Sequence, residues 1–282
     1  MAIALTCVAA CGGGGGATSG DDDSPIDGGS GSDAGSGDGP VSTSSFSFFV
    51  TSLKGLQDLS GNQLGFGGDL RFGETGDENS GAGLRGADKI CAALAEKSLA
   101  GAGGKTWHAF LSFSNDGSGN AVNAIDRIGN GPWYDRNGKM LADTLANIKN
   151  TRPLGGDASI KNDFPNENGV PNHDPDGTGD VDNHDMLTGS TTTGTLYAGK
   201  SNCLNWTGGT GNKTTEGQPR VGHSWPRGGG GGPGGMDAWM SSLTESGCAP
   251  GVNLVEMGGP MASSNTVGSG GGYGGFYCFA IN

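Results

Sequence analysis

LRGADKICAALAEKSLAG, residues 84–101, is the stretch that decides the fold, because it predicts a long helix with one buried face. Apolar residues recur in it at spacings of three and four, which places them on one side of a helix: Leu84, Ala87, Cys91 and Leu94. Gly101 is a plausible stop signal for this helix. Cys91 is therefore expected to point into the core.

Short strand candidates lie on both sides of this helix. They are rich in aromatic and β-branched residues, or alternate apolar residues with others: SFSFFVTSL (45–53), TWHAFLSFS (106–114), MLTGS (186–190), NCLNWT (202–207) and GGFYCFAI (274–281). Asn137-Gly138, within PWYDRNGKMLA (132–142), is the commonest two-residue hairpin signal. A short helix is expected at 142–148, and no element is expected in the Gly- and Asn-rich excursion that ends near residue 83. One long helix and many short strands predict an α+β domain.

The composition favours one compact domain with unstructured sequence attached. The 282 residues include 60 glycines, and only 33% are hydrophobic and 7% aromatic. The glycines crowd 12–39, 228–235 and 268–275, which we interpret as linkers or loops. A formal net charge of −13 argues against nucleic acid, heparin-like polyanions and anionic membrane surfaces as partners, and makes cations the natural ones.

The N-terminal segment, MAIALTCVAAC (1–11), predicts a secretion signal that ends in a lipid attachment site. Its apolar run is too short to span a bilayer, and Val8-Ala9-Ala10-Cys11 resembles the bacterial lipobox, in which the cysteine is acylated. No Lys or Arg precedes the run, which departs from the signal pattern and leaves open that the signal starts upstream. Residues 12–45 supply a Gly/Ser/Asp tether, and the folded domain is expected over 46–282. We therefore expect a lipid-anchored, monomeric protein of the bacterial cell envelope, on the outer membrane or cell surface.

Four of the six cysteines fall in the mature domain: Cys91, Cys203, Cys248 and Cys278. An even number in an exported chain predicts disulfides, with three possible pairings. No two of them form a CxxC pair, so disulfides are favoured over zinc or redox chemistry.

A family resemblance covers the chain from about Phe46 onward. It is carried by short blocks in a fixed order: FFVTS (48–52), LRGADKICAALA (84–95), TWHAFLS (106–112), IDRIGNGPWYDRNGKMLA (125–142), HDMLTGS (184–190), CLNWT (203–207), GHSW (222–225) and YCFA (277–280). Together they resemble a family of secreted bacterial proteins without characterised function, which are similar to collagen-derived endostatin and so to the C-type lectin-like fold. The resemblance implies nested disulfides, Cys91 to Cys278 and Cys203 to Cys248.

The calcium site of sugar-binding C-type lectins is not expected here. Those proteins use a Glu-Pro-Asn or Gln-Pro-Asp triplet and a Trp-Asn-Asp triplet. This chain has Gln218-Pro219-Arg220, with a cation where an acid is needed, and Asn205-Trp206-Thr207, without the acid. The net charge also argues against the basic heparin surface of endostatin.

A different calcium site is the strongest metal hypothesis. NHDPDGTGDVDNHD (172–185) lies in an acidic insertion, 154–185, and follows the spacing of a calcium loop with Gly177 at the turn. Its oxygen ligands would be Asn172, Asp174, Asp176, Thr178, Asp180 and Asp182. Position twelve is Asn183, where a bidentate acid is usual, although Asp182 or Asp185 could substitute. The alternative is a solvated insertion of turn-forming residues. A bound calcium ion would have a structural role.

The sequence predicts a binding or adhesion module for a protein or a glycan. No G-x-S-x-G motif is present. The alternative is a secreted enzyme of lectin-like fold, which would need a free thiol among the four domain cysteines, or a metal, to which His173 and His184 could contribute. His108 and His223 carry no motif. Trp239, beside the glycine run 228–235, is the tryptophan expected to be most exposed and the candidate for ligand contact.

Overall fold

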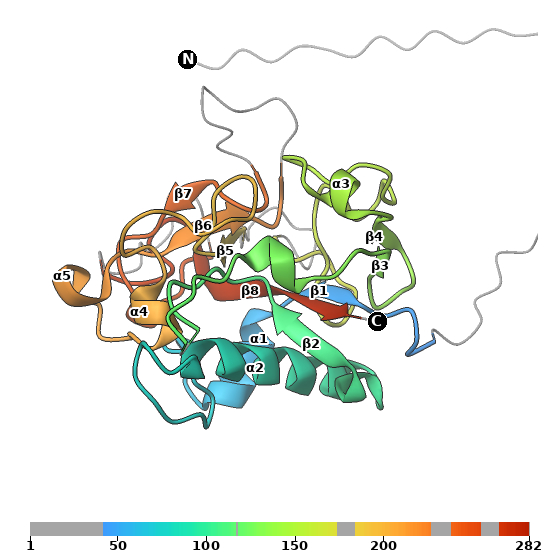
Figure 1. Ribbon diagram of the computed structural model, residues 1–282. Helices are drawn as coiled ribbons and strands as arrows, with labels where there is room; N and C mark the ends of the chain where they lie inside the picture. Colours follow the sequence, from blue (N-terminus) through green and yellow to red (C-terminus); the bar gives the residue numbers. More distant parts are fainter. Residues whose placement is uncertain (1–41, 117, 174–183, 227–237, 255–264, 282) are drawn as a thin grey trace, which may run out of the picture. The chain divides into compact units, whose positions relative to one another are not determined.

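The computed structural model describes residues 42–116, 118–173, 184–226, 238–254 and 265–281 (Figure 1). The chain divides into two units, 1–38 and 39–282, and all described residues belong to the second. This unit is a mixed α+β fold with few helices, short strands and two disulfides. None of the helices in these ranges is both long and apolar enough to cross a membrane.

Strand β8 (Gly272–Ile281) is the centre of the main sheet. It pairs antiparallel with β1 (Phe48–Val50) and β2 (Thr106–Ala109), and parallel with β5 (Asp185–Leu187) (Figure 1). The sheet continues from β5 to β6 (Arg220–His223) and then to β7 (Leu243–Thr244). Residues 272–280 of β8 are buried, because the strand has neighbours on both edges and packing on both faces.

The strand predicted over 274–281 is confirmed and begins two residues earlier, at Gly272, so the prediction of a loop over 268–275 is wrong for 272–275. A Cβ on Gly275 would lie 2.8 Å from Met186 Sδ, and one on Gly272 would lie 2.7 Å from the carbonyl oxygen of Asp185. The absent side chains allow β5 to approach β8 closely. These glycines are needed for close strand packing and do not make the chain flexible.

The predicted long helix is α2 (Ala82–Ser98), which packs against β2. Its expected core face is confirmed, since Ala87, Cys91 and Leu94 are fully buried and Leu84 nearly so. A second helix, α1 (Leu53–Ser60), was not predicted; the side chain of Ser52 caps it by accepting a hydrogen bond from the Gly55 amide. Gly55 lets α1 lie directly against α2, because a Cβ there would be 2.7 Å from Leu94 Cδ2.

The remaining elements are short. The hairpin β3 (Trp133–Tyr134) and β4 (Met140–Ala142) forms around Asn137-Gly138 as predicted, with Gly138 at φ +77. The expected helix near 142–148 is a single turn, α3 (Leu145–Ile148). The other helical turns are η1 (Ala102–Gly104), η2 (Ala124–Arg127), α4 (Cys203–Trp206) and α5 (Lys213–Glu216).

The strand predicted over 202–207 is wrong, because α4 is a helical turn with left-handed backbone angles. The four residues Cys203–Trp206 have φ between +47 and +62, a conformation that costs about 1–2 kcal/mol for each non-glycine residue. Tertiary bonds hold it: the Trp206 indole donates to the carbonyl of Ser112, and Asn205 Oδ1 accepts from the amide and the hydroxyl of Ser114.

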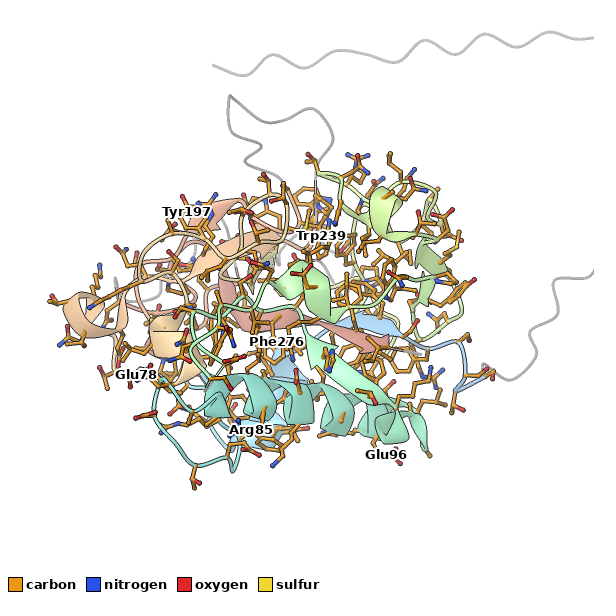
Figure 2. The ribbon with its side chains drawn as sticks, viewed as in Figure 1. Glu78, Arg85, Glu96, Tyr197, Trp239 and Phe276 are labelled. Atoms are coloured by element: carbon orange, nitrogen blue, oxygen red, sulfur yellow. A yellow bond between two sulfur atoms is a disulfide. The ribbon has the colours of Figure 1, made fainter. Side chains whose placement is uncertain are left out.

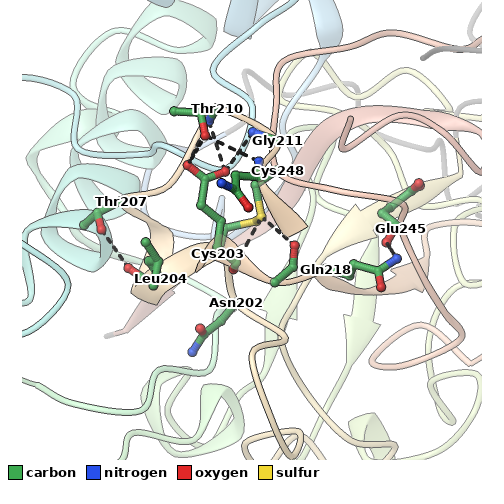
Figure 3. The surroundings of a disulfide bond; sticks show 12 residues. Asn202, Cys203, Leu204, Thr207, Thr210, Gly211, Gln218, Glu245 and Cys248 are labelled. Atoms are coloured by element: carbon green, nitrogen blue, oxygen red, sulfur yellow. Dashed lines mark hydrogen bonds between the residues drawn. A yellow bond between two sulfur atoms is a disulfide. The ribbon is translucent and has the colours of Figure 1, made fainter. Parts of the chain in front are cut away.

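The two disulfides have the pairing that the resemblance implies. Cys91–Cys278 joins α2 to β8, and Cys203–Cys248 joins α4 to the segment after β7 (Figure 3). The first closes a loop with a sequence separation of 187 residues, for which chain entropy predicts a stabilisation of about 5 kcal/mol. That is comparable with the total stability of a typical domain.

Candidate metal centre

Strands β5 and β6 bring an aspartate and a histidine together. Asp185 and His223 are direct partners in the antiparallel register of these strands, and directly opposed residues have Cβ atoms about 4.5–5.5 Å apart on one face of the sheet. His184 immediately precedes β5, and its carbonyl accepts a hydrogen bond of 2.7 Å from the Ser224 amide, which continues the pairing. Local strand pairing therefore positions all three side chains.

The three side chains form a compact cluster. Asp185 Oδ1 lies 3.1 Å from His223 Nε2 and 3.7 Å from His184 Nε2. The imidazole rings meet edge to face, with centroids 4.4 Å apart. One ligand atom from each residue lies within 4.8 Å of the other two. The side chains are only 3% (His184), 0% (Asp185) and 10% (His223) exposed.

Two imidazoles and one carboxylate are a ligand set for Zn²⁺ and other divalent transition metals. Two ligands at about 2.1 Å from one ion, in tetrahedral geometry, lie about 3.4 Å apart. The distances of 3.1 and 3.7 Å from Asp185 Oδ1 fall on either side of this value. Both distances from Asp185 are thus of the size expected for donor atoms that share one ion.

The same histidine does not form a Ser-His-Asp triad. Ser242 Oγ lies 3.0 Å from His223 Nε2, the same nitrogen that faces Asp185. In a triad the serine and the aspartate contact different nitrogens of the imidazole, so that one can accept while the other donates. The geometry therefore does not activate Ser242 as a nucleophile.

Glu245, directly after β7, places a second buried carboxyl beside Asp185. Its Oε2 accepts hydrogen bonds from Ser269 Oγ (2.5 Å) and the Gly270 amide (2.8 Å), and its carbonyl accepts one from Gln218 (Figure 3). Burial, and then the negative charge of Asp185, raise the pKa of Glu245 to about 8. At neutral pH, with no cation bound, Glu245 therefore keeps its proton.

The predicted calcium ligands lie mostly outside the described residues: Asp174, Asp176, Thr178, Asp180 and Asp182. Asn172 is described and is buried, and its Oδ1 accepts a hydrogen bond of 2.9 Å from the Tyr273 hydroxyl. The lipidation site Cys11 also lies outside these ranges.

His173, which was grouped with His184 as a possible metal ligand, is not part of the cluster. Its Nδ1 contacts Asp163, and its ring stacks on Trp225 with centroids 4.1 Å apart. His184 is instead joined by His223. Sequence spacing could not show this, because strand pairing makes the contact.

The prediction that Trp239 is exposed is wrong. Its side chain is fully buried, its indole donates to the carbonyl of Ile148, and its ring lies 4.7 Å from Phe110 and 5.2 Å from Tyr277 between centroids (Figure 2). A chain with few large apolar side chains places this one in the core, although a glycine run precedes it in the sequence. Trp239 therefore has no surface on which a ligand could stack.

None of the four domain cysteines has a free thiol that could act as a nucleophile. All four domain cysteines are joined in the two disulfides and fully buried. An enzyme that needed a free thiol among these residues is not compatible with this arrangement.

The comparisons with known proteins add no assignment. No protein-family model matches the chain, and no curated protein sequence matches it significantly.

Proposed function

We propose that this chain is an exported binding module of the C-type lectin-like fold, with a divalent transition-metal ion, Zn²⁺ in the first instance, held by His184, Asp185 and His223. The observation that carries the metal proposal is the spacing of the three donor atoms, all within 4.8 Å of one another. The burial of their side chains favours a structural ion over a catalytic one, because catalytic zinc keeps an open coordination position.

The disulfides support the fold and the compartment in this proposal. Their nested pairing agrees with what the resemblance implies, and disulfides are typical of proteins that mature in oxidising compartments. The N-terminal segment supports attachment to the cell envelope through a lipid on Cys11. The ligand of the module is a protein or a glycan, and a glycan array probed with the non-acylated chain separates these classes.

The metal proposal is tested by titrating Zn²⁺ into the metal-free chain that carries Cys11→Ser. We expect one ion per chain, and roughly a hundredfold loss of affinity or more in His223→Ala and in Asp185→Asn, because each removes one of the three ligands found among the described residues. His108→Ala is the matched control, since this histidine lies on β2 and contacts the carbonyl of Arg127. Near-ultraviolet circular dichroism checks that each variant is folded.

Absence of Zn²⁺ binding, or equal affinity in His223→Ala, would contradict the metal proposal. The cluster would then be a buried His-Asp ion pair with a role in stability alone. The same titration, made with Ca²⁺ and an Asp176→Ala, Asp180→Ala variant, tests the separate proposal of a structural calcium loop at 172–182.

A further inference from the structure

Glu245 has one buried oxygen without a hydrogen-bond partner. Its Oε2 is bound by Ser269 and Gly270, whereas Oε1 has no hydrogen-bond partner among the described residues, and the residue is fully buried. A buried carboxyl oxygen that accepts no hydrogen bond is unfavourable, and in folded proteins a bound water or ion is one of the explanations for such an oxygen. The unpaired oxygen therefore points to a ligand.

The unpaired oxygen lies at the cluster described above. A Cβ built on Gly270 would be 3.1 Å from Asp185 Oδ2 and 3.3 Å from Glu245 Oε1, so both oxygens border the same point of the backbone. The two carboxyls lie within hydrogen-bonding reach of each other. Ser269 and Gly270 fix the carboxyl through Oε2, as residues around a metal commonly orient its ligands.

We infer that Glu245 is the fourth ligand of the metal centre, through Oε1; this inference rests on the proposed function. The centre then has two imidazoles and two carboxylates. Two negative charges balance one divalent cation, which suits a site removed from water, because a buried net charge is strongly disfavoured. Four protein ligands also make the closed tetrahedral set of a structural zinc site.

With Glu245 as a ligand, the ion would cross-link neighbouring strands of the sheet. His184 precedes β5 and Asp185 begins it, His223 ends β6, and Glu245 follows β7 and accepts a hydrogen bond from the Gly270 amide in the turn before β8. One ion would join β5, β6 and β7 directly, and the turn before β8 through Glu245, in a part of the sheet that Cys91–Cys278 does not reach directly.

The test compares Zn²⁺ affinity and the Co²⁺ absorption spectrum in the Cys11→Ser chain and in Glu245→Gln. We expect at least a tenfold loss of affinity, together with a weaker visible Co²⁺ absorption as water replaces the lost carboxylate. Glu216→Gln is the matched control: Glu216 is also buried, but its carboxylate accepts hydrogen bonds from the amides of Thr210 and Gly211, which lie beside the other disulfide (Figure 3).

Each result of the Glu245→Gln experiment either supports or overturns Glu245 as the fourth ligand. Unchanged affinity and spectrum in Glu245→Gln would overturn the fourth ligand and leave a three-ligand centre. Lower affinity with an unchanged Co²⁺ spectrum would make Glu245 a positioning residue, which also overturns the inference. If the chain without the Glu245 change binds no metal, the proposed function fails, and the inference fails with it.

If Glu245→Gln does not fold, the fourth ligand can still be tested on the chain that keeps Glu245. Water-proton relaxation of the Co²⁺-loaded Cys11→Ser chain detects water bound to the ion. A closed set of four protein ligands predicts no bound water, and an exchangeable bound water would overturn it.

Discussion

Glu167 shows how burial changes the pKa of a single carboxyl away from the proposed metal centre. Its two oxygens accept hydrogen bonds from the hydroxyl (2.5 Å) and the amide (2.9 Å) of Ser52, at the start of α1. Burial raises the pKa of Glu167 above its ordinary value of 4.5 in spite of these bonds. In the pH range between 4.5 and the higher folded value, the unfolded chain has released this proton and the folded chain still holds it.

The sign of the resulting pH dependence follows from this difference. Where the folded state binds more protons, the free energy of unfolding falls as pH rises. We therefore expect Glu167→Gln, which cannot ionise, to gain stability relative to the unsubstituted chain as pH is raised from 4 to 7. Urea unfolding at each pH measures the difference. An equal pH dependence of the two chains over this range would contradict the assignment.

At this scale the sequence predicted burial better than it predicted the site. Helical spacing correctly placed Cys91 and Leu94 in the core, because both lie on one element. Asp185 was considered only as a substitute calcium ligand, and His223 and Glu245 were not selected. Their closeness depends on the pairing of strands that are far apart in the chain, which residue spacing does not report.

Helix α2 depends on a glycine at its closest approach to the preceding loop. A Cβ on Gly86 would lie 2.1 Å from the carbonyl oxygen of Leu70 and 2.3 Å from that of Arg71. Alanine usually stabilises a helix by about 1 kcal/mol relative to glycine. At Gly86 the clash with rigid backbone makes the same substitution destabilising.

We therefore expect Gly86→Ala to lower the free energy of unfolding by about 2 kcal/mol, a typical effect of overpacking. Gly104→Ala is the matched control, because a Cβ there meets nothing within 4 Å and its φ is not positive. Its effect should stay within about 0.5 kcal/mol. Urea unfolding compares the two, and similar values would contradict the packing argument.

The elements that were predicted correctly are those with local signals. Helical periodicity predicted α2, and Asn137-Gly138 predicted the β3–β4 hairpin. The left-handed turn α4 was missed because bonds from Ser112 and other distant residues hold it. The strand predicted over 274–281 missed the first two residues of β8, because the close approach of β5 accounts for the glycine at 272 and no local pattern encodes that approach.

For the whole molecule, the proposed lipid anchor predicts where the chain is found in a cell. If Cys11 is acylated, Cys11→Ser expressed with a complete signal should leave the membrane fraction, while Cys7→Ser should remain in it, because only Cys11 ends the lipobox. Cell fractionation with detergent extraction measures this. Retention of Cys11→Ser on membranes would contradict the anchor.

The place of β8 in the sheet has a further consequence for biosynthesis. Three strands, β1, β2 and β5, take their hydrogen-bond partner from residues 272–281, and the first of them begins at Phe48. The ribosome therefore makes most of this domain before the strand that the others need exists. We expect such a nascent chain to stay incompletely folded during its synthesis, which would suit the proposed export, in which the polypeptide passes unfolded through a secretion channel and folds on the far side.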